Sequence, residues 1–331
     1  MNGLWSSTAV PGIMLPMKHW TFQWIVGLAL TVACGAGDKE LSAPDASAPD
    51  TVAPDTTPPP SFPTPPEKLG GERPADYYLP ADYTHDKTWP LVVLLHGFSA
   101  NGQVQNLYLG ISKHVDDLGF ILVVPNGTMN PNGLRFWNAT GACCDNFGQG
   151  VDDEAFLLGL LDETMTYFNV DPQRVSLLGH SNGGFMAYHM ACHAGDRISA
   201  IASIAGSTYF DEADCPGTTP VSVLQIHGTQ DQSIAFNGVP RSPMYAGYPS
   251  AVEIMERWRG RNGCDDDVSS VEAADLETLT AGEETDVTQW TQCTSGKSVA
   301  LWQMNGVGHI PIFSDGAMPK ALHFLLGESA P

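Results

Sequence analysis

The chain has 331 residues, of which 43% are hydrophobic, and a formal net charge of -22 at pH 7. This length and apolar content allow one α/β domain of about 250 residues to bury a large core. The charge argues against a nucleic-acid partner, because phosphate backbones are bound by clusters of Lys and Arg, and 15 such residues stand against 37 Asp and Glu.

Residues 1–34 have the composition of an export signal. An apolar run over residues 20–33 follows Lys18 and is too short to span a bilayer as a stable helix. The run ends in "LTVAC", which is similar to a bacterial lipoprotein signal with Cys34 as the lipidated residue. An ordinary cleaved secretory signal is the alternative. Both interpretations predict an exported bacterial protein, either secreted or anchored by lipid in the periplasm or on the outer surface.

A proline-rich segment separates this signal from the rest of the chain. Residues 41–66 read "LSAPDASAPDTVAPDTTPPPSFPTPP", with few apolar side chains and no period that buries a face. Residues 35–69 are therefore predicted to be a disordered, extended linker. One folded domain is predicted over residues 70–331, and a lipid on Cys34 is the one contact with a membrane that we expect.

Strands and helices alternate in the predicted domain. The predicted strands cover residues 91–95, 121–124, 175–178, 200–205, 221–226 and 298–304. The predicted helices cover residues 103–118, 152–168, 182–193, 250–262 and 317–326. Four of the strands are near-continuous apolar runs, as expected for strands buried on both faces. The pattern predicts an α/β fold with a mostly parallel central sheet and helices on both faces.

The stretch "GHSNG" joins a predicted buried strand to a predicted helix. A tight strand–turn–helix connection needs glycines where a Cβ would clash, here Gly179 and Gly183. The turn is expected to lift the Ser181 hydroxyl to the carboxyl edge of the sheet. The amide of Asn182 then lies at a helix N-terminus, where it stabilises negative charge on a nearby oxygen. This context predicts a nucleophile at Ser181; the alternative is a serine that caps the helix.

A serine nucleophile needs a histidine base, and the histidine needs an acid to orient it. After such a turn the acid and the histidine come later in the chain, in that order. "VLQIHGTQD" supplies Asp231 just beyond a predicted strand, and "MNGVGHIPIF" supplies His309 just beyond the last one. Asp286 and Asp315 are weaker alternatives for the acid.

A second donor to the oxyanion is expected at the end of the first long strand. "LVVLLHGFSANG" ends that strand in His96 and Gly97, and the amide that follows such a pair faces the nucleophile. The backbone N–H of Phe98 is therefore the predicted second donor, with its side chain lining the acyl pocket. His96 itself is interpreted as a structural residue that hydrogen-bonds the loop.

The motifs together resemble those of the poly(3-hydroxybutyrate) depolymerase-like esterases, which include feruloyl and acetylxylan esterases. The resemblance rests on "PLVVLLHG", "PNG" with "FWNA", "GVDDEAFLLGLLDE", "GHSNGGFMAY", "IHGTQD" and "GVGH", and it extends from about residue 70 to residue 326. It implies an α/β-hydrolase fold and serine esterase chemistry that needs no metal or organic cofactor. Many members have Thr-Trp-Pro after the histidine, whereas Ile310 and Pro311 follow His309 here.

A different aromatic residue is then needed for substrate contact. Trp137, in the long glycine-rich loop "RFWNATGACCDNFGQG", is the best candidate, with Phe147 as a further one. The alternative is that Trp137 covers the flank of the domain.

Cysteine usage agrees with export. Apart from Cys34 there are six cysteines, an even number in an oxidising compartment. The preferred disulfides are Cys192–Cys215 and Cys264–Cys293, which leaves Cys143 and Cys144 for a vicinal bridge. Metal binding is the alternative, but the cysteines lack the paired spacing of zinc ligands.

The sequence thus predicts an exported, monomeric serine esterase that acts on a small or polymer-borne ester. Short-chain esters and the hydroxycinnamoyl or acetyl esters of polysaccharides are the expected substrates. The alternatives are a polyester depolymerase, a serine peptidase and a non-catalytic surface lipoprotein.

Overall fold

The computed structural model describes residues 61–328. The predicted signal segment with Cys34, and most of the predicted linker, lie outside the described residues. The last part of that linker is packed against the domain. The ring of Phe62 stacks on His85 at 4.2 Å between centroids, and Leu69 is fully buried and pairs with the backbone of Ala75. The folded domain therefore begins before Gly70, because Phe62 and Leu69, near the end of the predicted linker, already pack against it.

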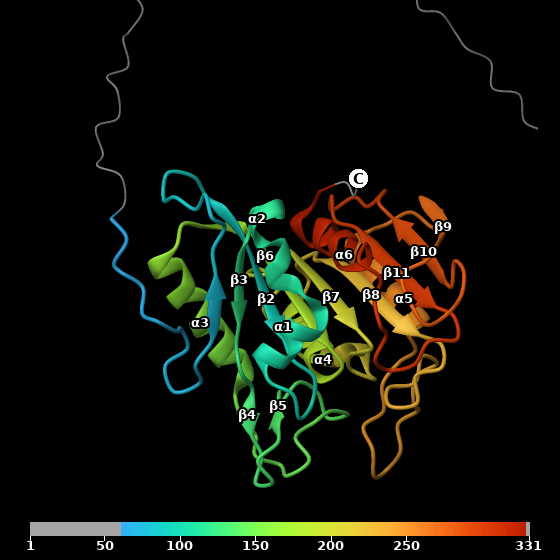
Figure 1. Ribbon diagram of the computed structural model, residues 1–331. Helices are drawn as coiled ribbons and strands as arrows, with labels where there is room; N and C mark the ends of the chain where they lie inside the picture. Colours follow the sequence, from blue (N-terminus) through green and yellow to red (C-terminus); the bar gives the residue numbers. More distant parts are fainter. Residues whose placement is uncertain (1–60, 329–331) are drawn as a thin grey trace, which may run out of the picture. The chain divides into compact units, whose positions relative to one another are not determined.

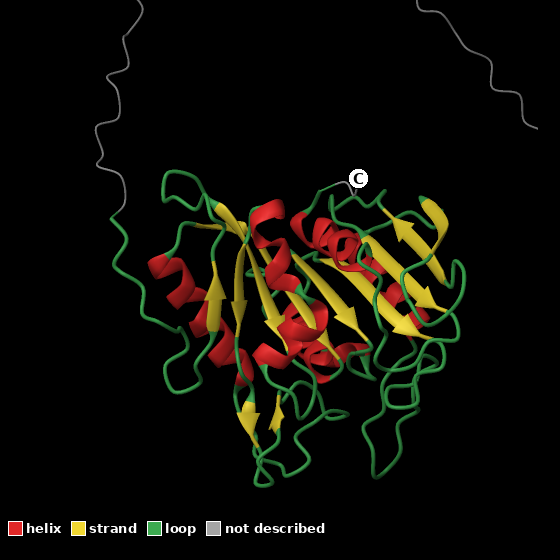
Figure 2. Ribbon diagram, in the orientation of Figure 1, coloured by secondary structure: helices red, strands yellow, loops and turns green. Residues whose placement is uncertain are grey.

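A large, mostly parallel sheet forms the centre of residues 61–328 (Figures 1 and 2). Its strand order is β1-β3-β2-β6-β7-β8-β11-β10-β9, and β1, β9 and β10 run antiparallel to their neighbours. The strands are β1 (Asp76–Tyr78), β2 (Trp89–Leu95), β3 (Ile121–Val124), β6 (Val170–His180), β7 (Ala200–Ile204), β8 (Ser222–Gly228), β9 (Ser270–Ala274), β10 (Thr285–Trp290) and β11 (Val299–Met304). A separate antiparallel pair consists of β4 (Thr128–Met129) and β5 (Arg135–Phe136).

Helices cover both faces of this sheet (Figure 2). They are α1 (Gly102–Leu109), α2 (Val115–Leu118), α3 (Asp153–Tyr167), α4 (Asn182–His193), α5 (Ala251–Asn262) and α6 (Ala317–Leu326), with 3-10 turns at Ile111–His114 and Glu212–Asp214. Helices α3, α4 and α5 share one core with Leu91, Val93 and Leu95 of β2. The alternate residues Val92 and Leu94 enter the second core, under α1, α2 and α6. Both faces of β2 are buried, which is why its sequence is a continuous apolar run.

The structure departs from the predicted elements by a divided helix and by five short or peripheral strands, β1, β4, β5, β9 and β10, that were not predicted. The helix predicted over residues 103–118 is divided at Gly110, whose φ of 67° ends α1 in the left-handed conformation. Strands β9 and β10 were not predicted, because they lie in the acidic segment between Cys264 and Cys293. They lie at one edge of the sheet, and the sequence of β10 has no apolar run that marks a strand.

The covalent cross-links agree with the predicted pairing. The structure contains the disulfides Cys143–Cys144, Cys192–Cys215 and Cys264–Cys293.

Across residues 61–328, no helix combines the length and apolar character needed to cross a membrane.

Candidate active site

The turn between β6 and α4 holds Ser181 in an unusual backbone conformation. Its φ is 55° and its ψ is -118°, which few non-glycine residues adopt. A Cβ on Gly179 would lie 2.1 Å from the carbonyl oxygen of Gly183, and one on Gly183 would lie 2.2 Å from that of Leu95. The Ser181 amide donates to the carbonyl of Ile204 at 2.7 Å. The glycines therefore allow the close packing that places the serine at the carboxyl edge of the sheet.

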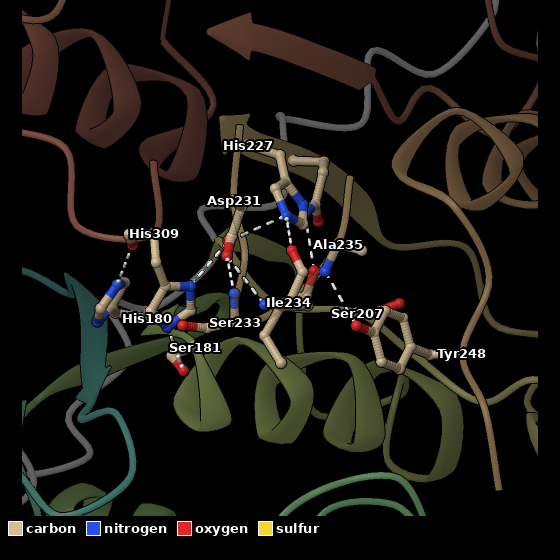
Figure 3. A network of polar contacts seen from close by, with 12 residues as sticks. His180, Ser181, Ser207, His227, Asp231, Ser233, Ile234, Ala235, Tyr248 and His309 are labelled. Carbon is tan, nitrogen blue, oxygen red and sulfur yellow. Dashed lines mark hydrogen bonds and ion pairs between the residues drawn. The ribbon is translucent and has the colours of Figure 1, made fainter. Parts of the chain in front are cut away.

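Three side chains from distant parts of the chain meet at this turn (Figure 3). His309 Nε2 lies 2.9 Å from Ser181 Oγ, and His309 Nδ1 lies 2.7 Å from Asp231 Oδ2. Because a carboxylate only accepts, the Nδ1 proton points to Asp231 and leaves Nε2 free to accept from the serine. Asp286, the alternative acid, instead accepts from Asn305 Nδ2 at 2.8 Å. The structure thus brings together the three residues expected from their order in the chain.

The carboxylate of Asp231 is buried and surrounded by donors. Its Oδ1 accepts the amides of Ser233 and Ile234 at 2.8 and 2.9 Å, and His227 Nε2 lies 3.3 Å from Oδ2. Burial alone would raise the pKa of Asp231, but the hydrogen bonds from His227 and His309 outweigh it and hold this pKa well below its usual range. A carboxylate that stays ionised can stabilise a positive charge that forms on His309.

The loop after β2 is fixed on both sides of Phe98. The Gly97 amide donates to Gln105 Oε1 at 3.1 Å, and the Ser99 amide donates to the Arg135 carbonyl at 2.8 Å. The amide of Phe98 lies between these two anchored neighbours, and the amide of Asn182 is the first of α4. Fixed backbone N–H groups of this kind are the elements of an oxyanion hole.

Trp137 does not line a substrate pocket, so the prediction of substrate contact is wrong. Its side chain is 0% exposed, and its indole Nε1 donates to the His96 carbonyl at 3.0 Å. Its amide donates to Asn182 Oδ1 at 2.7 Å, and Asn182 Nδ2 donates back to its carbonyl at 2.9 Å. The start of the loop folds inward, so Trp137 connects the segment that precedes Phe98 to the start of α4. Phe147, further along the same loop, is exposed.

Two more histidines lie beside the site in neutral form. His96 Nε2 accepts the Gly127 amide at 2.9 Å, and its Nδ1 donates to the Gly97 carbonyl at 2.8 Å, which confirms its structural role in the loop. His180 Nε2 donates to the carbonyl of His309 at 3.1 Å. Burial lowers the pKa of each ring to about 4. The role of His180 was not predicted, because nothing in the sequence shows that its ring reaches the loop of His309.

The polar residues behind Asp231 were missed as well. Gln225 and His227 are buried at alternate positions of β8, a strand that is otherwise mostly apolar. Polar side chains two residues apart in a buried strand point to one face and need partners there, which is a signal that the sequence offered.

Among residues 61–328, no group of three or more His, Cys, Asp or Glu side chains could hold a metal ion.

Comparison with known proteins places this chain among esterases. A family model described as "Putative esterase" matches residues 67–296. Feruloyl esterase B of Piromyces equi is 28% identical over 246 residues, which cover 72% of this chain and 42% of that protein. A bifunctional acetylxylan esterase/xylanase of Neocallimastix patriciarum is 24% identical over 249 residues, 74% of this chain and 32% of that protein. The chain therefore spans less than half the length of these two relatives.

A solved structure supports the architecture. The acetyl xylan esterase from Aspergillus awamori has a TM-score of 0.57 and 15% identity to this chain, and the match covers 78% of this chain and 95% of that one. Identity this low shows a shared fold alone. The mostly parallel sheet with helices on both faces is the α/β-hydrolase fold, as predicted.

Proposed function

This chain belongs to the esterase family, and from that premise we propose that it hydrolyses carboxylic esters through an acyl-enzyme on Ser181. The observation that carries this proposal is the hydrogen-bonded line from Ser181 Oγ through both nitrogens of His309 to Asp231, at 2.9 and 2.7 Å. A hydroxyl in contact with a neutral imidazole that is oriented by a carboxylate is an activated nucleophile.

In the first half of the reaction Ser181 Oγ attacks the ester carbonyl carbon while His309 Nε2 takes its proton. The carbonyl electrons move to oxygen, and the amides of Phe98 and Asn182 stabilise that charge. Asp231 stabilises the imidazolium. The C–O bond to the alcohol then breaks, and His309 returns the proton to the departing alkoxide. The enzyme is left acylated on Ser181.

In the second half a water molecule repeats the sequence. His309 removes a proton from the water, the hydroxide attacks the acyl carbon, and the same two amides stabilise the second oxyanion. Collapse of this intermediate breaks the bond to Ser181 Oγ, which regains a proton from His309. The neutral His180 supports both halves, because its ring centroid lies 5.2 Å from that of His309 and a charge there would oppose the imidazolium.

The substrate class that we propose is an ester carried by a polysaccharide, with a hydroxycinnamoyl, acetyl or other short acyl group. The support is that the two relatives are named a feruloyl esterase and an acetylxylan esterase. We also propose that the protein works outside the cytoplasm, which the three disulfides support.

A substrate panel tests this function. Purified protein is assayed on p-nitrophenyl acetate, methyl ferulate, acetylated xylan, crystalline polyhydroxybutyrate and a peptide anilide. We expect turnover of the soluble and polysaccharide esters, and a loss of roughly 10⁴- to 10⁶-fold in Ser181→Ala. Rapid clearing of the polyester with little hydrolysis of soluble esters would move the chain to the depolymerases. Preferred cleavage of the anilide would make it a peptidase, and no turnover at all would make it non-catalytic.

A further inference from the structure

A chain of buried hydrogen bonds continues behind Asp231, on the side away from His309. The Tyr188 hydroxyl, on α4, lies 2.8 Å from Gln225 Oε1, and Gln225 Nε2 lies 2.9 Å from His227 Nδ1. His227 Nε2 in turn lies 3.3 Å from Asp231 Oδ2. Tyr188, Gln225 and His227 are at most 2% exposed. The contacts therefore form one buried line from the middle of α4 to the catalytic carboxylate.

The direction of each hydrogen bond in this line follows from the orientation of the Gln225 amide, which the backbone determines. Gln225 Nε2 also lies 2.9 Å from the carbonyl oxygen of Gly206, which only accepts, so this end of the side chain must be the NH₂ group. Its second hydrogen then points at His227 Nδ1. Full burial raises the pKa of Tyr188 well above its usual value, so its phenol keeps the proton and donates to Gln225 Oε1.

An NH₂ group cannot accept, so His227 Nδ1 must be the unprotonated nitrogen. The ring proton is therefore on Nε2. That proton meets the carbonyl oxygen of Ile234 at 2.8 Å and Asp231 Oδ2 at 3.3 Å. In the opposite tautomer the proton is on Nδ1. Nε2 would then direct a lone pair at the Ile234 carbonyl and the Asp231 carboxylate, and the Nδ1–H would point at the NH₂ group of Gln225, so that two donors would face each other. The amide of Gln225 thus selects the tautomer that donates toward the carboxylate.

We propose that His227 is a positioning residue for the triad and that Gln225 fixes the tautomer in which it acts. His227 and His309 approach the same oxygen of Asp231 from two sides (Figure 3). With Oδ1 held by two amides, the donor at Oδ2 limits rotation of the carboxylate and shares its charge. The residue acts through Asp231 and touches no substrate. This inference rests on the proposed ester hydrolysis for its kinetic consequences.

Several ionisable groups surround Asp231, and each of them can contribute to the pH dependence of kcat/KM. His227 comes from β8, His309 from the loop after β11, His180 from the end of β6, and Tyr248 from the segment before α5. Removing the donor on His227 leaves more of the carboxylate charge for His309, so Asp231 holds protonated His309 more strongly. The acid limb of the kcat/KM profile, which reports the base of the free enzyme, is then expected at higher pH.

The test compares His227→Phe, which keeps a ring without donors, with His227→Gln, whose amide can donate again. We expect His227→Phe to lower kcat roughly 10- to 100-fold, the factor for one hydrogen bond to a charged group, with little change in KM. Its acid limb is expected to move up by roughly 0.5 to 1 pH unit. His227→Gln is expected to recover most of both effects. Gln225→Met, which leaves the tautomer unselected, should fall between wild type and His227→Phe.

Ser207→Ala is the matched control, because Ser207 Oγ donates to the Pro249 carbonyl at 3.1 Å and is buried nearby without touching the line. It should lower stability and leave the acid limb in place. Long-range proton–nitrogen NMR correlations of the wild type provide a readout without activity, and they should show His227 protonated at Nε2. Protonation at Nδ1, or a folded His227→Phe enzyme with the wild-type profile, would overturn the proposal. A wild type without esterase activity would overturn the proposed function instead, while the NMR result still decides the tautomer.

Discussion

His96 and His180 are ordinary histidines that the fold keeps uncharged. Each is buried, each donates one ring proton to a backbone carbonyl, and burial lowers the pKa of each to about 4. In the unfolded chain both rings return to a pKa near 6.5. Between pH 6.5 and about 4 the unfolded state therefore binds more protons than the folded state.

This difference predicts that stability falls as the pH is lowered through that window. The interval from 6.5 to about 4 corresponds to on the order of 3 kcal/mol for each ring, fully present above pH 6.5 and lost toward pH 4. The protonation of Asp231 destabilises the fold at still lower pH, because its folded pKa is depressed. Urea unfolding of the wild type and of His180→Gln at pH 7 and pH 4.5 measures the effect. The variant should lose less stability between the two pH values, and an equal loss would contradict the assignment.

Trp137 was predicted to contact the substrate, but the structure shows it as a buried residue that supports the site. With its indole and backbone bonded to His96 and Asn182, it supports the segments that carry both proposed oxyanion donors. Trp137→Phe is expected to lower kcat roughly tenfold with little effect on KM, because a small displacement of these amides weakens transition-state binding. Phe147→Ala, in the exposed part of the same loop, is the control and should leave kcat unchanged. A Trp137→Phe enzyme with raised KM and normal kcat would contradict this role and would favour the original prediction that Trp137 contacts the substrate.

The residues that could be predicted from the sequence are those with a positional rule. Ser181 lies in a glycine-flanked turn, and Asp231 and His309 each follow a strand that is recognisable as an apolar run. No such rule says whether a loop residue such as Trp137 points inward or outward. The contact between His227 and Asp231 depends on the conformation of the loop after β8. That loop turns back, so the Ile234 carbonyl contacts His227 and the Ile234 amide contacts Asp231.

At the scale of elements, the interior was predictable and the edges were not. Strands buried on both faces appear as apolar runs, and each of the six predicted strands corresponds to a strand of the sheet. Four of the five predicted helices correspond to α3, α4, α5 and α6. Strands β9 and β10 are polar in composition, so the pairing of β9 with β10 and of β10 with β11 depends on tertiary context. Gly110 divided a predicted helix because a single left-handed residue outweighs the helical pattern on either side.

The Cys264–Cys293 disulfide closes this edge far from the chemistry. Trp290, at the end of β10, pairs with Val299, the first residue of β11, whereas His309 follows the opposite end of β11. Replacing both cysteines by serine is expected to lower stability by about 3–4 kcal/mol, given a sequence separation of 29 residues, without changing kcat/KM. Thermal unfolding and ester kinetics on the same sample check this. A large loss of activity in the folded variant would contradict this and would show that the disulfide affects the site through the β9–β10 connection, where Glu277 Oε1 accepts the Ile312 amide at 3.0 Å.

For the whole molecule, the three disulfides support the proposal that the protein works outside the cytoplasm. We propose that Cys34 carries a lipid. In a bacterial host the full-length protein should then fractionate with membranes and incorporate labelled fatty acid, and Cys34→Ala should do neither. A mature N-terminus well beyond Cys34 without lipid would instead identify an ordinary secretory signal.

The nucleophile itself is open to direct measurement. A fluorophosphonate reacts with an activated serine hydroxyl and leaves a stable phosphonyl group on its oxygen. Mass spectrometry of peptides from the treated protein should locate that group on Ser181, with labelling lost in Ser181→Ala and strongly slowed in His309→Ala. Labelling of another residue, or a wild-type protein that hydrolyses methyl ferulate and p-nitrophenyl acetate while Ser181 stays unmodified, would contradict the account.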